Sequence, residues 1–136
     1  MINELIEILK KEDEALNKLL KLLDKQFTLI MEKDTFKLDA IVTEIQLCNK
    51  EVAEAEVERR KLTGKASMSN IIENASSDEL DNSFRKIKKT IEAIKLQKDT
   101  NEMLIKQELG FTTRMLSMLT PKKEAKTYSS YGTIRR

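Results

Sequence analysis

The chain has 136 residues, of which 35% are charged, 40% hydrophobic and only 4% aromatic, with three glycines, one proline and one cysteine. This composition indicates one domain of a few long helices and excludes collagen-like, proline-rich disordered and disulfide-stapled proteins. The formal net charge is +2 and histidine, a common general base and metal ligand, is absent, so we expect neither catalysis nor a metal or cofactor site.

Apolar residues with helical spacing predict a first helix over residues 2–32. Its stripe repeats every seven residues, with a second set alongside: Ile2, Leu9, Leu16, Leu23 and Ile30, then Leu5, Ile6, Leu19, Leu20 and Phe27. Such a stripe is wide enough to face a bundle core rather than a single partner helix. Asp34 follows a short break and is expected to cap the next helix, because its carboxylate can accept from free backbone N–H groups.

A second helix is predicted over residues 35–63, with Gly64 in the position of a left-handed cap. Its stripe consists of Leu38, Ile41, Ile45, Cys48, Val52, Ala55 and Leu62. Cys48 is therefore expected to be a small core residue rather than a reactive thiol. The two-residue connection allows an antiparallel hairpin or a kinked continuous rod. We favour the hairpin, because both stripes need a partner.

Residues 67–76 predict one short helix, and Ser76 with Glu79 forms a capping-box pattern ahead of a third long helix over residues 77–119. Pro121 ends this helix. The expected fold is thus an all-α antiparallel bundle of three long helices with a short connecting helix. Residues 1–120 form the bundle domain, and residues 121–136 form a basic flexible tail.

The third helix, of about 43 residues and about 65 Å, would exceed the hairpin by about 20 Å. Its last dozen residues would then overhang, and an exposed apolar face of this kind needs a partner. A bend near Gly110 that closes the helix over the bundle end is the alternative. The expected partner-binding residues are Met103, Leu104, Phe111, Met115, Leu116, Met118, Leu119, Tyr128 and Tyr131.

Polar residues interrupt the stripe of the third helix at Lys98, Asn101 and Glu108. A buried asparagine can fix the register between helices at a cost in stability. The alternative interpretation is a bundle whose middle is more hydrated. Arg59 lies on the apolar stripe of the second helix, which suggests an ion pair with Glu108. Antiparallel geometry does not support this pair, because it places the two residues at opposite ends of the bundle.

The tail is basic, with a net charge of +4 over residues 121–136 against −2 over residues 1–120. It could bind nucleic acid or an anionic membrane weakly, remain unused, or dock on a protein through Tyr128 and Tyr131. No apolar run approaches the roughly 20 residues of a membrane span, and the N-terminus lacks the apolar core of a secretory signal. We expect a cytoplasmic protein with no nucleic-acid partner and no membrane insertion.

The order of these features resembles the FlgN-type flagellar export chaperones. The resemblance rests on the amphipathic first helix, the break at residues 32–36, the close of the second helix at residues 59–64, residues 101–104 and the tail from Tyr128 to Gly132. It implies a cytoplasmic chaperone that binds the C-terminal helical region of hook-associated proteins. Such a chaperone keeps these clients unpolymerised and delivers them to the flagellar type III export gate, without nucleotide or metal. Two tyrosines close together leave open which one matches the family's tail position.

Two other functions fit the same residues. A structural coiled-coil adaptor would use the heptads to form a homodimer or to scaffold partners, with the overhang buried between two copies. A nucleic-acid or membrane accessory protein would depend on the basic tail.

Overall fold

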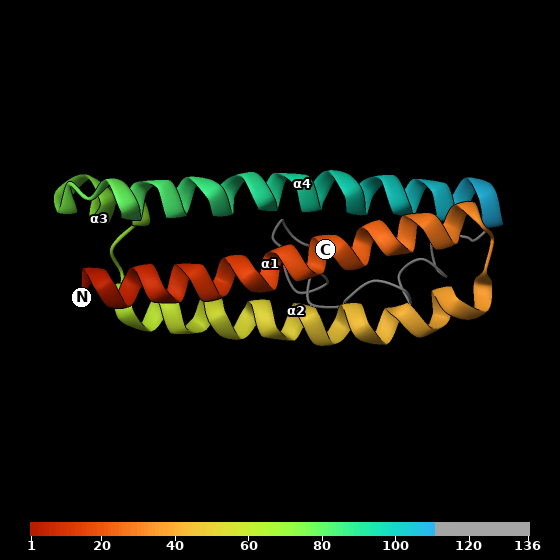
Figure 1. Cartoon of the computed structure of the whole chain (residues 1–136), viewed down its shortest axis with the longest axis horizontal. Helices are drawn as coiled ribbons and strands as arrows, with labels where there is room; N and C mark the ends of the chain where they lie inside the picture. The colour runs from red at the N-terminus through yellow and green to blue at the C-terminus, as the bar shows by residue number, and fades with distance from the viewer. Residues whose placement is uncertain (111–136) are drawn as a thin grey trace, which may run out of the picture.

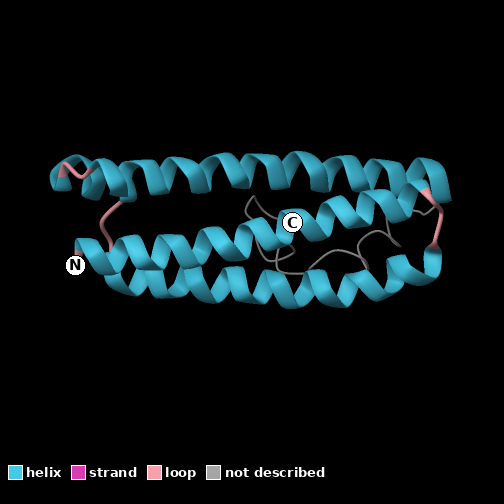
Figure 2. Cartoon of the chain, viewed as in Figure 1, coloured by secondary structure: helices cyan, strands magenta, loops and turns pink. Residues whose placement is uncertain are grey.

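The computed structural model describes residues 1–110 of the chain, and residues 111–136 lie outside the description. Within the described residues every regular element is a helix, and short loops join the helices (Figure 2). Four helices follow in order: α1 (Ile2–Met31), α2 (Thr35–Thr63), α3 (Met68–Ala75) and α4 (Asp78–Leu109). The all-α class is confirmed for this part of the chain, and the first three helices lie within one residue of their predicted bounds.

Side-chain caps explain where α2, α3 and α4 begin. Asp34 accepts a hydrogen bond from the backbone N–H of Lys37 at 3.0 Å, as predicted for the start of α2. The expected capping box at Ser76 is wrong by one residue, because Ser77 accepts from the N–H of Leu80 at 3.2 Å and begins α4. Ser76 instead ends α3 in the left-handed conformation, with φ 51° and ψ 38°, so it is not available as the cap of the next helix.

The three long helices lie side by side with α1 between α2 and α4 (Figure 1). Helix α2 returns antiparallel to α1, which confirms the hairpin over the kinked rod, and α4 runs in the direction of α1. Helix α1 packs extensively against both neighbours, whereas no comparable contact joins α2 to α4. The expected bundle arrangement of the three long helices is therefore not confirmed, because α2 and α4 lack the close contact that each makes with α1. The wide stripe of α1 can serve two partners, while α2 buries one narrow stripe.

The core consists of two clusters, one toward each end of the molecule. The cluster near the α1–α2 turn includes Leu29, Ile30, Ile41 and Ile105. The cluster at the α3 end includes the following residues: Leu5, Leu9, Met68, Leu80 and Ile87. Phe27, expected in the core, is 36% exposed. Polar side chains on α1 that the stripe did not include are buried instead, because neighbours cover α1 on two sides.

Helix α4 ends at Leu109, ten residues before the predicted end at residue 119. Gly110 follows in the left-handed conformation, with φ 69° and ψ 21°, which glycine adopts without the steric cost that a side chain would add. At 32 residues, α4 is nearly as long as the 30-residue α1. The expected unbroken helix is therefore wrong at Gly110, where the alternative interpretation placed a bend. Residues 111–119 of the expected overhang lie outside the described residues.

Candidate functional site

A groove of about 500 Å³ lies between α2 and α4, with α1 as its floor. It exists because α2 and α4 each pack on α1 and share little contact with each other. Most of its lining is apolar: Leu16, Leu19 and Leu23 from α1, Ile45 and Val52 from α2, and Phe84, Ile87, Ile91, Ile94 and Ile105 from α4.

The walls of the groove keep part of their apolar surface in contact with solvent. The floor residue Leu16 is buried, but Val52, Phe84, Ile91 and Ile94 are only half-buried. Full burial of such a side chain is favourable by about 1.5–3 kcal/mol relative to full exposure. A partner that covers the walls would therefore gain a fraction of that free energy at each residue.

The length of the groove corresponds to several turns of a helix that lies along it. Its lining on the floor helix extends from Glu12 to Gln26, which corresponds to about 21 Å or four helical turns. Amphipathic helices bind such grooves through apolar side chains at i, i+3, i+4 and i+7.

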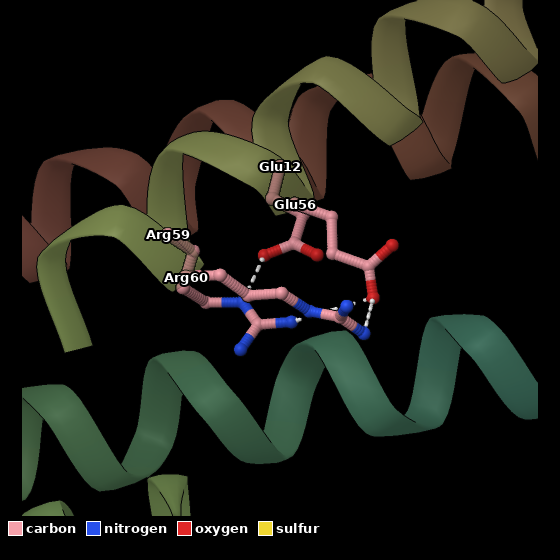
Figure 3. A network of polar contacts seen from close by, with 4 residues as sticks. All are labelled: Glu12, Glu56, Arg59 and Arg60. Carbon is pink, nitrogen blue, oxygen red and sulfur yellow. Dashed lines mark hydrogen bonds and ion pairs between the residues drawn. The ribbon is translucent and has the colours of Figure 1, made fainter. Parts of the chain in front are cut away.

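An ion pair closes the end of the groove nearer α3. The Arg59 Nε atom of α2 donates to Glu12 Oε1 of α1 at 3.0 Å, and the side chains are only 17% and 6% exposed. Glu56 lies 3.8 Å from Arg59 Nη2 and 2.9 Å from Arg60 Nη2. Figure 3 shows the two carboxylates pointing toward the two guanidinium groups. As expected, Arg59 lies away from Glu108; its actual partner, Glu12, lies on the neighbouring helix.

Burial controls the protonation of Glu12. Loss of solvent raises the pKa of the Glu12 carboxyl above its ordinary value, and the charge and hydrogen bond of Arg59 lower it in part. The folded protein therefore keeps the Glu12 carboxylate at a cost that Arg59 offsets in part.

A second buried polar group lies near the other end of the groove. Asn101 of α4 is 1% exposed and donates through Nδ2 to the Leu23 carbonyl at 2.8 Å and to Gln26 Oε1 at 2.9 Å. Its Oδ1 atom accepts from Gln97 Nε2 at 2.9 Å. These bonds join α4 to α1, as the register interpretation expects, and Gln26 itself lines the groove.

The predicted partner-binding residues do not line this groove within the described chain. Met103 is 52% exposed on α4, outside the groove, and Leu104 is half-buried against the core cluster near the α1–α2 turn. The other predicted residues lie outside the described residues: Phe111, Met115, Leu116, Met118, Leu119, Tyr128 and Tyr131. The groove residues were missed because their stripes were assigned to a closed core. The available signal was the width of the α1 stripe, which indicates a helix with two neighbours.

Cys48 lies in the core, as expected, where its Sγ atom donates to the Ala15 carbonyl at 3.4 Å. Burial raises the pKa of its thiol, with a smaller contribution from the charge of Glu51. Residues 1–110 contain no group of three or more side chains that could hold a metal ion. Among the helices described, none combines the length and the hydropathy needed to span a bilayer.

Comparison with protein families gives a match over the whole chain. A family model described as FlgN protein matches residues 1–136, the whole chain. No curated protein and no solved structure matches the chain.

Proposed function

The chain belongs to the FlgN family, which comprises flagellar export chaperones, and from this premise we propose that it binds the C-terminal helical region of hook-associated proteins. In the cytoplasm it keeps these clients from assembling prematurely and aids their delivery to the export gate.

The apolar groove is the observation that supports this proposal. It offers half-buried aliphatic and aromatic side chains over about four turns, and client segments that assemble through helices present a matching apolar stripe. A client helix in the groove would contact both α2 and α4 and cover the walls that these helices leave open.

The C-terminal residues of the chain supply a second proposed contact. Ile105 lines the groove, and Phe111 follows six residues later. Phe111, Met115 and Leu119 are four residues apart, a spacing that aligns them on one face where the chain is helical. We propose that these residues extend the client site and that Tyr128 or Tyr131 docks on the client or the export gate.

Substitutions in the walls test the groove. Ile91→Asp on α4 and Val52→Asp on α2 should each weaken binding of the C-terminal segments of hook-associated proteins from the same genome. We expect a loss of at least about tenfold in affinity, or about 1.4 kcal/mol, because each variant places a carboxylate where the client's apolar stripe packs. Isothermal titration calorimetry with the full chain measures the affinity of each variant.

Matched controls lie on the outer faces of the same helices. Leu96→Asp on α4, 71% exposed, and Leu47→Asp on α2, 60% exposed, lie outside the groove and should change the affinity less than twofold. Circular dichroism verifies that all four variants fold. Equal losses in wall and control variants would contradict the groove as client site. A stable dimer with no affinity for any client segment would favour the coiled-coil adaptor.

The C-terminal contact has its own test. Phe111→Ala or Met115→Ala should weaken client binding by about 1 kcal/mol or more with little loss of helix content. Ile41→Ala, in the core and outside the groove lining, should instead lower the melting temperature first. If Phe111→Ala unfolds the protein while the remaining folded fraction binds the client unchanged, Phe111 is a core residue and this contact is wrong.

A further inference from the structure

Some charged side chains of the groove lining have a partner of opposite charge in the part of the chain that the structure describes, and others do not. The carboxylates of Glu12 and Glu56 are both paired with Arg59, and Glu56 also contacts Arg60. Near the other end of the groove, Glu102 also has a partner. Each glutamate of the groove lining therefore has a partner within the described chain.

The α4 wall presents two cations without a carboxylate partner among residues 1–110. Lys88 places its ammonium 5.3 Å from the centre of the Phe84 ring, and it takes part in none of the ion pairs of the described residues. Lys95 likewise has no ion pair there. Both lysines line the groove and are exposed. Since they are seven residues apart on one helix, about 10.5 Å separates them along the wall.

We propose that the helix bound in the groove carries acidic side chains, seven residues apart, along the edge that meets α4. This inference rests on the proposed function, since it describes the helix that fills the same groove. A ligand helix lying along α4 has the same rise per residue, so carboxylates at i and i+7 face Lys88 and Lys95 together. Flanking charges of this kind select partner and orientation in coiled coils.

The lysines also determine the direction of the bound helix. An amphipathic helix with its apolar stripe on the α1 floor can lie in the groove in two opposite directions. Reversal of the helix exchanges the edges that meet α2 and α4. The acidic edge of a helix with one such edge therefore meets Lys88 and Lys95 in only one of the two directions. Electrostatic complementarity of this type contributes specificity and orientation more than raw affinity.

Two synthetic helical peptides test the inference on the full chain. Both are about 18 residues long, enough to cover the groove, and share one apolar stripe; one edge carries glutamates at i and i+7 in the first peptide and lysines in the second. We expect the wild-type chain to prefer the acidic-edged peptide by about fivefold at about 20 mM salt, and by less than about twofold at about 500 mM. Fluorescence anisotropy measures both affinities.

The double variant Lys88→Glu with Lys95→Glu should reverse this preference. The control double variant Lys50→Glu with Lys89→Glu has the same change in net charge, at exposed positions outside the groove, and should keep the wild-type preference. Equal affinity for both peptides, with Ile91→Asp abolishing both, would overturn the charge inference and leave the groove as a helix site. Failure of both peptides to bind would also overturn it, while the client segments test the proposed function separately.

The chain's own C-terminal residues are the competing occupant. A photo-reactive residue at position 91 of the full chain reports what covers the wall. We expect cross-links to the acidic-edged peptide. Cross-links to residues 111–136 that the peptide does not displace would contradict the proposal.

Discussion

Arg59→Ala should lower the free energy of unfolding by about 2–4 kcal/mol at pH 7, because it leaves the carboxylate of Glu12 buried without its countercharge. The Glu12 side chain is 6% exposed, and Arg59 Nε is its closest cation at 3.0 Å. Urea unfolding followed by circular dichroism measures the change.

The effect should depend on pH with a defined sign. The folded state holds the Glu12 proton more tightly than the unfolded state, because burial raises its pKa from the ordinary value of 4.5. For such a group, stability falls as the pH rises through the unfolded pKa toward the folded one. Loss of Arg59 removes the two largest influences that lower this pKa. The difference between Arg59→Ala and wild type should therefore be largest at neutral pH and shrink below the unfolded pKa of Glu12, where the carboxyl is neutral in both states.

The neighbouring arginine provides the control. Arg60 pairs with Glu56 at 2.9 Å, but its side chain is 70% exposed, so Arg60→Ala should cost less than about 1 kcal/mol. The double variant Glu12→Leu with Arg59→Met removes both charges and should recover most of the loss. A similar loss in Arg59→Ala and Arg60→Ala, or a loss independent of pH, would show that the buried pair is not the cause.

Asn101→Asp should destabilise the protein by about 3 kcal/mol or more. The substitution removes both hydrogen bonds that Asn101 donates and places a carboxylate against two acceptors, the Leu23 carbonyl and Gln26 Oε1. Buried charge next to acceptor oxygens is among the few causes of such large losses. Differential scanning calorimetry of the full chain measures it.

The same helix contains a matched control. Asn82 is exposed on α4, so Asn82→Asp makes the identical chemical change in solvent and should alter stability by no more than about 0.5 kcal/mol. Asn101→Leu keeps the volume without the charge and should cost less than Asn101→Asp. If Asn101→Asp is as stable as wild type, the hydrogen bonds of Asn101 between α4 and α1 do not hold the helices in register.

The helices could be predicted from the sequence because their signals are local. Heptad spacing along α1 and the Asp34 cap depend on neighbours within a few residues, and both are confirmed. The end of α4 was wrong for the opposite reason. Apolar residues continue past Gly110 with helical spacing, and one glycine in a helical pattern costs only about 1 kcal/mol relative to alanine, so periodicity alone extends the helix through it.

The groove and the Arg59–Glu12 pair depend on how the helices are placed relative to one another. The stripe of α4 has the same appearance in a closed bundle as in a helix that lies close to α1 and farther from α2. Arg59 and Glu12 are 47 residues apart, so only the pairing of α1 with α2 brings them together. The predicted surface at Phe111, Met115 and Leu119 stays a prediction, because those residues lie outside the described part.

The central position of α1 has a consequence for how the fold comes apart. The hairpin of α1 and α2 is held by one interface, and among the described residues α4 makes its most extensive contact with α1. Cooperative units of unfolding follow such boundaries. Release of α4 would break its bonds to α1 at Asn101 and leave the Arg59–Glu12 pair of the hairpin intact. We therefore expect two foldons, with the free energy of sub-global opening of α4 set mainly by its interface with α1.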